Sequence, residues 1–346
     1  MIFRGLDKNF VLLAEVPAIN MQWKRRYYDY GEFEVQLRWA DYDPDMAYIW
    51  NTKTNEVAII DKFNPKNEGH GDFVYLSGYF CESWLSYGVV VDHGTVPVNV
   101  ITACRTMVTN RIINNSLRLP ATIEIGNLKS HSSNIDAYPD DESEVGLLCK
   151  KLLTSIEYAQ KLRFDYSTKK FYYDIVQGID RSVEGANHCV FSERLKNIND
   201  LDYSYDQSDY KNYADIKISR GGNPERFDYT NVDISKNNEP IRKIKFEVSD
   251  TKSATDHDAR VAARQKASLE LLNHKIVENA NFEPATNSYE YMVDYDLGDI
   301  VQIVIAGIEV SISLRIIGID EVHKKHTREI KLQFGDMKKL NYRKRW

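Results

Sequence analysis

The sequence has few cysteines and no long apolar run, and both absences narrow the kinds of protein it can encode. Its 346 residues include four cysteines. No apolar run approaches the roughly 20 residues that span a bilayer, and residues 1–20 lack the features of a secretory signal, so we expect no membrane insertion. The cysteines form no Cys-x-x-Cys pair, which predicts neither a zinc site nor a disulfide framework. We expect four small buried residues of a protein assembled in a reducing cytoplasm: Cys81, Cys104, Cys149 and Cys189.

A surplus of positive charge and the motifs of catalysis are also missing. The net charge is −6 at pH 7, which argues against a general nucleic-acid binder, because such binding depends on a surplus of Lys and Arg. Asp41, Asp43 and Asp45 are spaced like a calcium loop but lack its later Gly and Glu. His323 and His326 have no thiolate nearby. Without a nucleophile turn or a paired-histidine zinc motif, we expect no catalytic residue, no metal, no cofactor and no enzyme.

Aromatic residues are plentiful, and their pattern in residues 1–92 predicts strands. Aromatics make up 12% of the chain, with 22 tyrosines, which favours strands and large interfaces over a helical bundle. Residues 33–39 alternate apolar and polar side chains, and residues 48–60 read as a hairpin around a polar turn. Further strands are expected at residues 9–16, 73–80 and 85–91. We therefore predict a first, small β-barrel domain over residues 1–92.

The period of the apolar residues changes in residues 93–176, which predict a small α/β domain. A helix is expected to begin at Pro97, and a second one to be capped by Ser143. Strands should follow at residues 163–165 and 171–176. The expected inner faces of the two helices are Val98, Ile101, Cys104, Val108 and Ile112 for the first, and Leu148, Leu152, Ile156 and Ala159 for the second.

The rest of the chain divides into a β-rich segment, residues 177–255, and a helix followed by strands, residues 256–346. The segment 177–255 either completes the barrels or forms an accessory domain. It contains an expected edge hairpin or loop at residues 199–213 and strands at 215–219 and 242–248. Asp256 is expected to cap a helix that runs to about Lys275, with an inner face of Ala262, Leu269, Leu272 and Ile276.

Three strands are expected near the C-terminus, at residues 299–305, 308–316 and 330–334. A three-stranded meander cannot bury its apolar face alone, so it must close as a barrel or sandwich with other strands. The tail from Lys338 to Trp346 holds five basic residues and is either a solvated end or a contact for an acidic partner.

Three separated stretches carry a resemblance to a known family. The first is W-K-R-R-Y-Y-D-Y-G-E-F over residues 23–33, the second is G-I-D-R-S over residues 178–182, and the third runs from D-L-G-D-I-V to F-G-D between residues 296 and 336. Together, in this order, they resemble the siphovirus-type phage tail-tip or baseplate hub proteins, which lie between the distal tail protein and the tail fibre. Within the first stretch the matching residues are Trp23, Arg25, Arg26, Asp29, Gly31 and Phe33.

This resemblance implies the phage tail hub fold: α+β, mainly β, with two tail-tube-like β-barrel domains and an inserted small α/β domain. It also implies a homotrimer at the virion tail tip that closes the tail tube, converts six-fold to three-fold symmetry and attaches a tail fibre or spike. The tail tube or distal tail protein ring and the tape measure protein are the further implied partners. DNA would pass through the lumen without specific binding, and we expect an acidic lumen wall, since phosphate attraction needs cations.

The same stretches supply the candidate functional residues. Trp23, Arg25, Arg26, Tyr27 and Tyr28 are candidates for a subunit interface; alternatively, the arginines lie on an exposed strand and stack on aromatics. Asp180 and Arg181 are expected to form an ion pair that locks a turn. The glycines expected at structural turns are Gly31, Gly178, Gly298 and Gly335.

Two alternative functions remain open from the sequence. A carbohydrate-binding β protein of the tail tip would expose clustered aromatic side chains in a groove. A cell-wall hydrolase would need clustered acidic and basic side chains, for which the sequence offers no motif.

Overall fold

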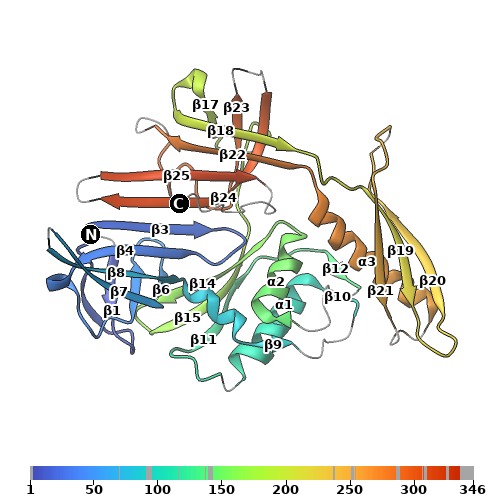
Figure 1. Ribbon diagram of the computed structural model, residues 1–346, viewed down its shortest axis with the longest axis horizontal. Coiled ribbons are helices and arrows are strands. Elements are labelled where there is room, and N and C mark those ends of the chain that lie inside the picture. Colours follow the sequence, from blue (N-terminus) through green and yellow to red (C-terminus); the bar gives the residue numbers. More distant parts are fainter. Residues whose placement is uncertain are drawn as a thin grey trace.

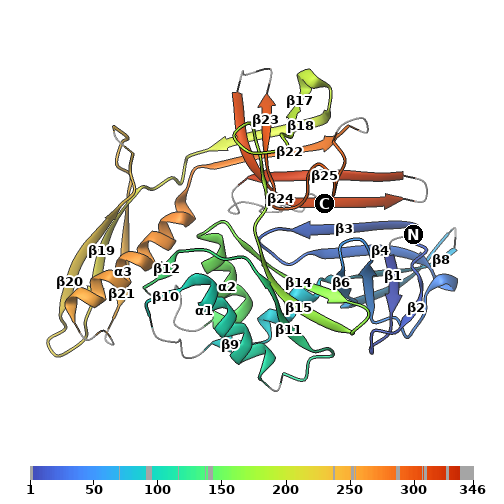
Figure 2. The same cartoon turned by 180° about the vertical axis from the view of Figure 1, so that it is seen from behind.

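The computed structural model is mainly β and describes residues 3–69, 71–90, 96–115, 117–136, 138, 143–236, 238–250, 253, 255–285, 289–305, 307, 310–324 and 327–335. The described residues of 3–79 form an N-terminal half, those of 180–206 and 277–335 a C-terminal half, and those of 81–176 an α/β module, and these three parts pack together. A small lobe, residues 213–274, stands apart from them (Figures 1 and 2). The predicted tail from Lys338 to Trp346, Asp336 and His326 lie outside the described residues. No helix in the described part of the chain is long and apolar enough to cross a membrane.

The N-terminal half packs a four-stranded sheet against four strands of a longer one. The smaller sheet has the order β2-β1-β5-β6 and includes the predicted hairpin, β5 with β6. The longer sheet contributes β3, β4, β8 and β7, and the predicted alternation is confirmed in β4, where Phe33, Val35 and Leu37 are buried. Trp39 departs from it because the strand ends there in a 3₁₀ turn, η1 (Trp39–Asp41), and its side chain is 48% exposed. The strands are β1 (Phe3–Leu6), β2 (Leu12–Glu15), β3 (Asn20–Arg26), β4 (Glu32–Arg38), β5 (Tyr48–Asn51), β6 (Glu56–Ile59), β7 (Lys62–Glu68) and β8 (Gly71–Tyr79).

The longer sheet continues without interruption into the C-terminal half. Its path is β18-β22-β25-β24-β3-β4-β8-β7, and every neighbouring pair is antiparallel. The predicted C-terminal meander is confirmed as β23, β24 and β25. Two short strands, β16 and β17, run parallel to β23. The bounds are β16 (Asp180–Arg181), β17 (Val190–Ser192), η4 (Glu193–Leu195), β18 (Ile198–Asp206), β22 (Val277–Pro284), β23 (Ile300–Ile305), β24 (Val310–Lys324) and β25 (Thr327–Gly335).

No closed barrel forms among the described strands, although the sequence predicts two. The reason lies in β24, which is 15 residues long. Its first part pairs with β23 and its second part with β3, so the strand passes from the C-terminal half to the N-terminal half instead of turning back. Each half therefore contributes four strands to the path of one open sheet.

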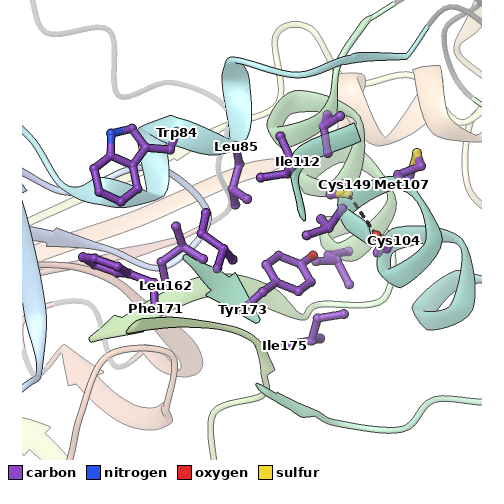
Figure 3. Packing of buried hydrophobic residues seen from close by; sticks show 14 of the residues in the cluster. Trp84, Leu85, Cys104, Met107, Ile112, Cys149, Leu162, Phe171, Tyr173 and Ile175 are labelled. Carbon is purple, nitrogen blue, oxygen red and sulfur yellow. Dashed lines mark hydrogen bonds between the residues drawn. The ribbon is translucent and has the colours of Figure 1, made fainter. Parts of the chain in front are cut away.

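The α/β module lies against the N-terminal half and encloses the largest apolar cluster (Figure 3). Helices α1 and α2 cover strands β11, β15 and β14, and Trp84, Leu162 and Tyr173 fill the space between. All four cysteines are buried and unoxidised, as predicted. The elements are η2 (Cys81–Ser86), β9 (Val89–Val90), β10 (Val98–Asn99), α1 (Val100–Val108), the π-helical turn η3 (Thr109–Ile113), β11 (Ile123–Leu128), β12 (Asn134–Ile135), β13 (Ser143–Glu144), α2 (Val145–Thr154), β14 (Ala159–Asp165) and β15 (Lys170–Val176).

Both predicted helix starts in this module are shifted. Helix α1 is capped by Asn99, whose side chain accepts from the backbone N–H groups of Ile101 and Thr102, so Pro97 precedes the helix. Ser143 pairs in a short strand with Val90 instead of capping α2. The predicted strand at residues 85–91 is confirmed only at β9, because Leu85 and Ser86 end the 3₁₀ helix η2, and Val91 lies outside the described residues.

The lobe is a three-stranded sheet covered by one helix, set apart at the right of Figure 1. Its sheet has the order β20-β19-β21. Helix α3 is capped by Thr255, whose hydroxyl accepts from the Asp258 N–H, and not by the predicted Asp256, which is the first residue of the helix. The predicted inner face of α3 is wrong: an alanine stripe with Leu271 packs on the sheet, because small side chains let the helix approach closely. The bounds are β19 (Tyr213–Ser219), β20 (Phe227–Asp233), β21 (Lys243–Ser249), α3 (Asp256–Leu271) and η5 (Leu272–His274), and the buried helix residues are Ala259, Ala263, Ala267 and Leu271.

The close contact of α3 with its sheet gives a testable prediction. Ala263→Leu should lower the free energy of unfolding by about 1–3 kcal/mol, since three extra carbons have no space against Ile216 and Ile218. Ala262→Leu, one position away on the half-buried side, is the control and should change it by less than about 0.5 kcal/mol. Urea denaturation measures both, and equal effects would contradict the assigned face.

Candidate functional site: a charged junction and a polar sheet face

The two halves of the chain meet where β3 pairs with β24. Residues 23–33, the first of the three stretches that carry the family resemblance, begin on β3. Trp23 and Arg25 project toward the core, opposite Glu321 and Ile319 of β24. Trp23 is fully buried, with its ring 4.3 Å from that of Phe80 between ring centres. Alternate residues of β3 therefore reach the interior of both halves at once.

Arg25 ties three segments together inside the chain. Its Nε donates to the two carboxylate oxygens of Glu56, at 2.8 and 3.0 Å. One terminal nitrogen donates to the Tyr291 hydroxyl at 2.8 Å and to Asp296 at 2.7 Å. Burial opposes the charged form, but the charges of Glu56 and Asp296 outweigh it and hold the pKa of Arg25 well above its usual value. The Trp23 indole N–H donates to Glu56 as well, at 3.1 Å.

A second buried carboxylate, Glu321, extends this network into the C-terminal half. Its side chain is 0% exposed and accepts from the Tyr291 hydroxyl at 3.0 Å and from Arg328 at 2.8 Å. His323, which the sequence excluded as a zinc ligand, lies 3.2 Å from the same carboxylate. Burial alone would raise the pKa of Glu321, but the bonds from His323 and Arg328 outweigh it and lower the pKa. The carboxylate is therefore held ionised inside the protein.

The second and third resemblance stretches meet each other at the edge of this junction. Arg181 donates to Asp299 at 2.7 Å, and the Ile179 N–H donates to the same carboxylate at 2.7 Å. The predicted ion pair of Arg181 with Asp180 is thus wrong in its partner, because Asp180 accepts instead from the Ser182 N–H. The sequence gives no signal for a pairing across 118 positions beyond the two motifs themselves.

Glycines make the contact between these two stretches possible. Gly298 has φ +95°, a conformation that L side chains rarely adopt, and a Cβ there would overlap the Tyr27 ring. A Cβ at Gly178 would overlap the carbonyl of Gly298. Gly31 lies against the Phe80 ring and Gly335 ends β25, so each predicted glycine lies at a turn, a strand end or a close approach.

The five candidate interface residues lie mostly inside the chain. Trp23, Arg25, Arg26 and Tyr27 are buried, and Tyr28 is half-buried. The alternative of arginines on an exposed strand is wrong for the same reason. Burial in one chain means that these side chains join segments of that chain, and their contact with another subunit stays a prediction.

A cleft of about 470 Å³ opens at the junction and is lined by charged side chains from all three parts. Four of its carboxylates are held by arginines: Glu56 and Asp296 by Arg25, Asp174 by Arg163, and Asp299 by Arg181. The fifth, Glu82, is buried, and its Oε1 has no hydrogen-bond partner among the described residues; Lys161 lies 3.8 Å away. Burial raises the pKa of Glu82 above its usual value, and the nearby Lys161 opposes that rise only in part.

The junction contains no arrangement set up for nucleophilic or metal chemistry. A reactive thiol needs a lowered pKa, whereas burial raises the pKa of Cys189 to about 12 and that of Cys81 well above its usual value. Within the described ranges no three His, Cys, Asp or Glu side chains lie close enough to hold a metal ion. The arrangement is suited to holding three segments in a fixed geometry.

The opposite, polar face of the long sheet is the other candidate functional surface. Over β3, β24 and β25 its lysines are paired with acidic neighbours: Lys24 with Glu32, Lys324 with Glu329, and Lys331 with Glu283. Amide and hydroxyl side chains lie between them, and a hollow of about 240 Å³ lies on this face over β3, β4, β8 and β7. The face is strongly polar; its charges are balanced over these central strands, and β7 adds the exposed Lys62 and Lys66.

Comparisons with known proteins agree on the kind of protein. A family model described as Siphovirus ReqiPepy6 Gp37-like protein matches residues 2–336. The prophage tail protein gp18 of Listeria monocytogenes EGD-e has a similar fold, with a TM-score of 0.60 at 9% identity, covering 98% of this chain and 95% of that chain. The tail protein of Neisseria meningitidis MC58 gives a TM-score of 0.58 at 10% identity, covering 97% of each chain.

A third solved structure, the 43 kDa tail protein of prophage MuSo2 from Shewanella oneidensis, gives a TM-score of 0.55 at 8% identity, covering 96% of this chain and 97% of that chain. At such low identities these likenesses show the fold alone. No sequence among the curated proteins matches the chain.

The two buried glutamates should affect stability in opposite directions. Glu321→Gln should lower the free energy of unfolding at pH 7 by about 2 kcal/mol, because its ionised form is hydrogen-bonded to charged partners. Glu82→Gln should raise it by roughly 1 kcal/mol, because it removes a buried carboxylate that lacks a donor.

Acid should reduce both effects. The lowered pKa of Glu321 means that its contribution is present above its unfolded value near 4.5 and is lost as pH falls through the folded value. The raised pKa of Glu82 has the reverse sign: its penalty is lifted as pH falls through the folded value. Urea midpoints of wild type and both variants from pH 7 to pH 4 measure this, and two shifts of the same sign would refute it.

The close approach of Gly178 and Gly298 gives a further prediction. Gly178→Ala should cost about 1–3 kcal/mol of unfolding free energy, because the new methyl group meets backbone that cannot move aside. Gly69→Ala, where a Cβ meets nothing within 4 Å, is the matched control. Thermal unfolding of both variants provides the comparison, and equal melting temperatures would show that the contact is not tight.

Proposed function

This chain belongs to the family of siphovirus ReqiPepy6 Gp37-like proteins, and we propose that it is the baseplate hub of a phage tail. Family membership over residues 2–336 makes it a structural component of the tail or baseplate. The finer parts of the proposal are a ring of three copies, closure of the tail tube, the change from six-fold to three-fold symmetry, and attachment of a fibre or spike.

The continuous eight-strand sheet is the observation that carries this proposal. Four of its strands come from the N-terminal half and four from the C-terminal half, joined at β3 and β24. Each half thus supplies a four-stranded unit to the same surface. Three copies in a closed ring would present six such units, which matches a six-membered tube on one side and a three-fold partner on the other.

The charge balance of the polar sheet face supports a role as a lumen wall. We expected an acidic wall from the sequence; over β3 and β24 the face pairs basic side chains with carboxylates, as in Arg26 with Asp320 and Lys24 with Glu32. DNA binding depends on cations that neutralise phosphates and release counterions. A wall whose central cations are paired in this way would hold DNA only weakly.

The remaining parts of the proposal concern partners and domains. A ring of tail tube or distal tail protein would dock on one side and a fibre or spike on the other, with the tape measure protein inside. Assembly would occur in the host cytoplasm, ending at the virion tail tip. The divisions 1–92, 93–176, 177–255 and 256–346 are proposed as domains, with one core shared across residue 255 by α3 and β19–β21.

One surface feature favours a second candidate, a carbohydrate-binding protein of the tail tip. Trp39, Tyr42 and Phe63 form an aromatic cluster, with ring centres 5.2 to 6.1 Å apart, and Trp39 is 48% exposed. A glycan array with wild type and Trp39→Ala distinguishes the candidates, since sugar binding through this cluster would be lost in the variant. The hydrolase alternative has no such support, because four of the five carboxylates lining the cleft are engaged by arginines.

The trimer can be tested directly on the purified chain. We expect mass photometry to show a species of three times the 40.1 kDa chain mass, and negative-stain images of it to show rings with a central hole. A chain that stays monomeric across the accessible concentrations, or one that clears peptidoglycan in a zymogram, would overturn the proposal.

A further inference from the structure

The three-stranded sheet of the lobe has one face that no other element of the described chain covers. Helix α3 packs on the opposite face, against Ile216 and Ile218, and the whole lobe stands apart from the other three parts (Figures 1 and 2). We propose that the open side of β19, β20 and β21, which we call the outer face of the lobe, binds a neutral polysaccharide. This activity goes beyond the hub function and does not depend on a ring.

Alternation along β20 places two aromatic side chains on the outer face. Phe227 is 43% exposed and Tyr229 is 65% exposed. The residue between them, Asp228, turns to the other side of the sheet, where it accepts from Arg260 of α3 at 2.6 and 2.8 Å. Residues two apart on a strand lie about 7 Å from each other, so the two aromatic side chains are neighbours on one face. They offer an apolar platform to a ligand.

The charged side chains of the outer face balance one another. It carries three lysines and three carboxylates: Lys217, Lys243, Lys245, Asp215, Asp233 and Glu247. Lys243 pairs with Asp215 at 3.0 Å, and Lys245 pairs with Glu247 at 2.5 Å. The ammonium group of Lys217 lies 3.9 Å from the centre of the Phe227 ring. The outer face therefore has many groups that form hydrogen bonds but no net charge.

This charge balance argues against two classes of partner. Nucleic acids and other polyanions are held by a surplus of cations, which the outer face lacks. The core of a protein interface is depleted of Lys, Asp and Glu, whereas here Lys217 lies directly opposite Tyr229 on the neighbouring strand. The ligand that fits best is neutral and carries both apolar and hydrogen-bonding groups.

A sugar has both kinds of group. The face of a sugar ring presents C–H groups, which pack on an aromatic side chain, and its edge presents hydroxyls, which donate and accept hydrogen bonds. A sugar stacked on Tyr229 would have Lys217 across the strand and Asn231 two residues along it, both on the same face. The pair Asp215 and Lys243 extends the polar surface over the other two strands. A chain of sugars can use several of these positions at once.

A glycan array and affinity electrophoresis of the full-length chain test this assignment. We expect wild type to bind neutral glycans on the array and to be retarded in gels that contain dextran, laminarin or hydroxyethyl cellulose. Tyr229→Ala should weaken binding at least about ten-fold, because it removes the stacking ring, whereas Tyr229→Trp should keep it. Tyr205→Ala, which removes an exposed tyrosine from β18, and Trp39→Ala are the controls and should bind like wild type.

Two further measurements make the result specific to a neutral ligand and to an intact chain. The thermal unfolding of Tyr229→Ala should match that of wild type, because the side chain is 65% exposed and surface substitutions change stability little. Binding should stay the same when the salt concentration rises from about 0.05 M to about 0.5 M, because salt screens only charged contacts.

The outcomes separate this inference from the hub function. Wild type that binds no glycan, binding that survives Tyr229→Ala, or binding that salt abolishes would each overturn the assignment, and trimers in the same samples would leave the hub standing. Binding lost in Trp39→Ala and kept in Tyr229→Ala would place the sugar at the Trp39 cluster instead. Monomers that bind glycans through Tyr229 would support the outer face and overturn the ring.

Discussion

The buried guanidinium of Arg25 is the constraint on which the arrangement of this protein depends. A buried charge is costly unless it is paired and hydrogen-bonded, and Arg25 meets that condition only with Glu56 from the N-terminal half and with Tyr291 and Asp296 from the C-terminal half. Separating the halves would therefore remove Tyr291 and Asp296 from Arg25 and leave Glu56 as its remaining partner. Glu321 imposes the same condition from the other side through Tyr291 and Arg328. The hydrogen bonds of these buried side chains, together with the burial of apolar surface, therefore fix the relative position of the two halves.

The same network also fixes the register of the continuous sheet. Trp23 lies opposite Glu321 and Arg25 opposite Ile319, and a slip of β3 by one residue would turn Arg25 to the polar face, away from Glu56 and Tyr291, and bring Lys24 inside. Because the eight-strand path depends on this one seam, the positions of its two outer edges are set by the network at its centre.

Local patterns in the sequence predicted much of the fold, and long-range contacts account for what was missed. The alternation in β4, the β5–β6 hairpin and the C-terminal meander depend on neighbouring residues and turns, and all three are confirmed. The inner face of α3 was misjudged because hydrophobicity favoured leucines, whereas close packing on the sheet favoured alanines. The open sheet could not be foreseen, since nothing local shows that β24 changes partner along its length.

The candidate residues show the same division between local and long-range information. The motifs around Arg25, Arg181 and Gly298 were found in the sequence, but their roles were assigned to separate turns and to a subunit surface. The structure brings them together inside one chain, because Arg181 reaches Asp299 and the Tyr27 ring covers Gly298. A motif shows that a residue is constrained, and only the fold shows what it is constrained against.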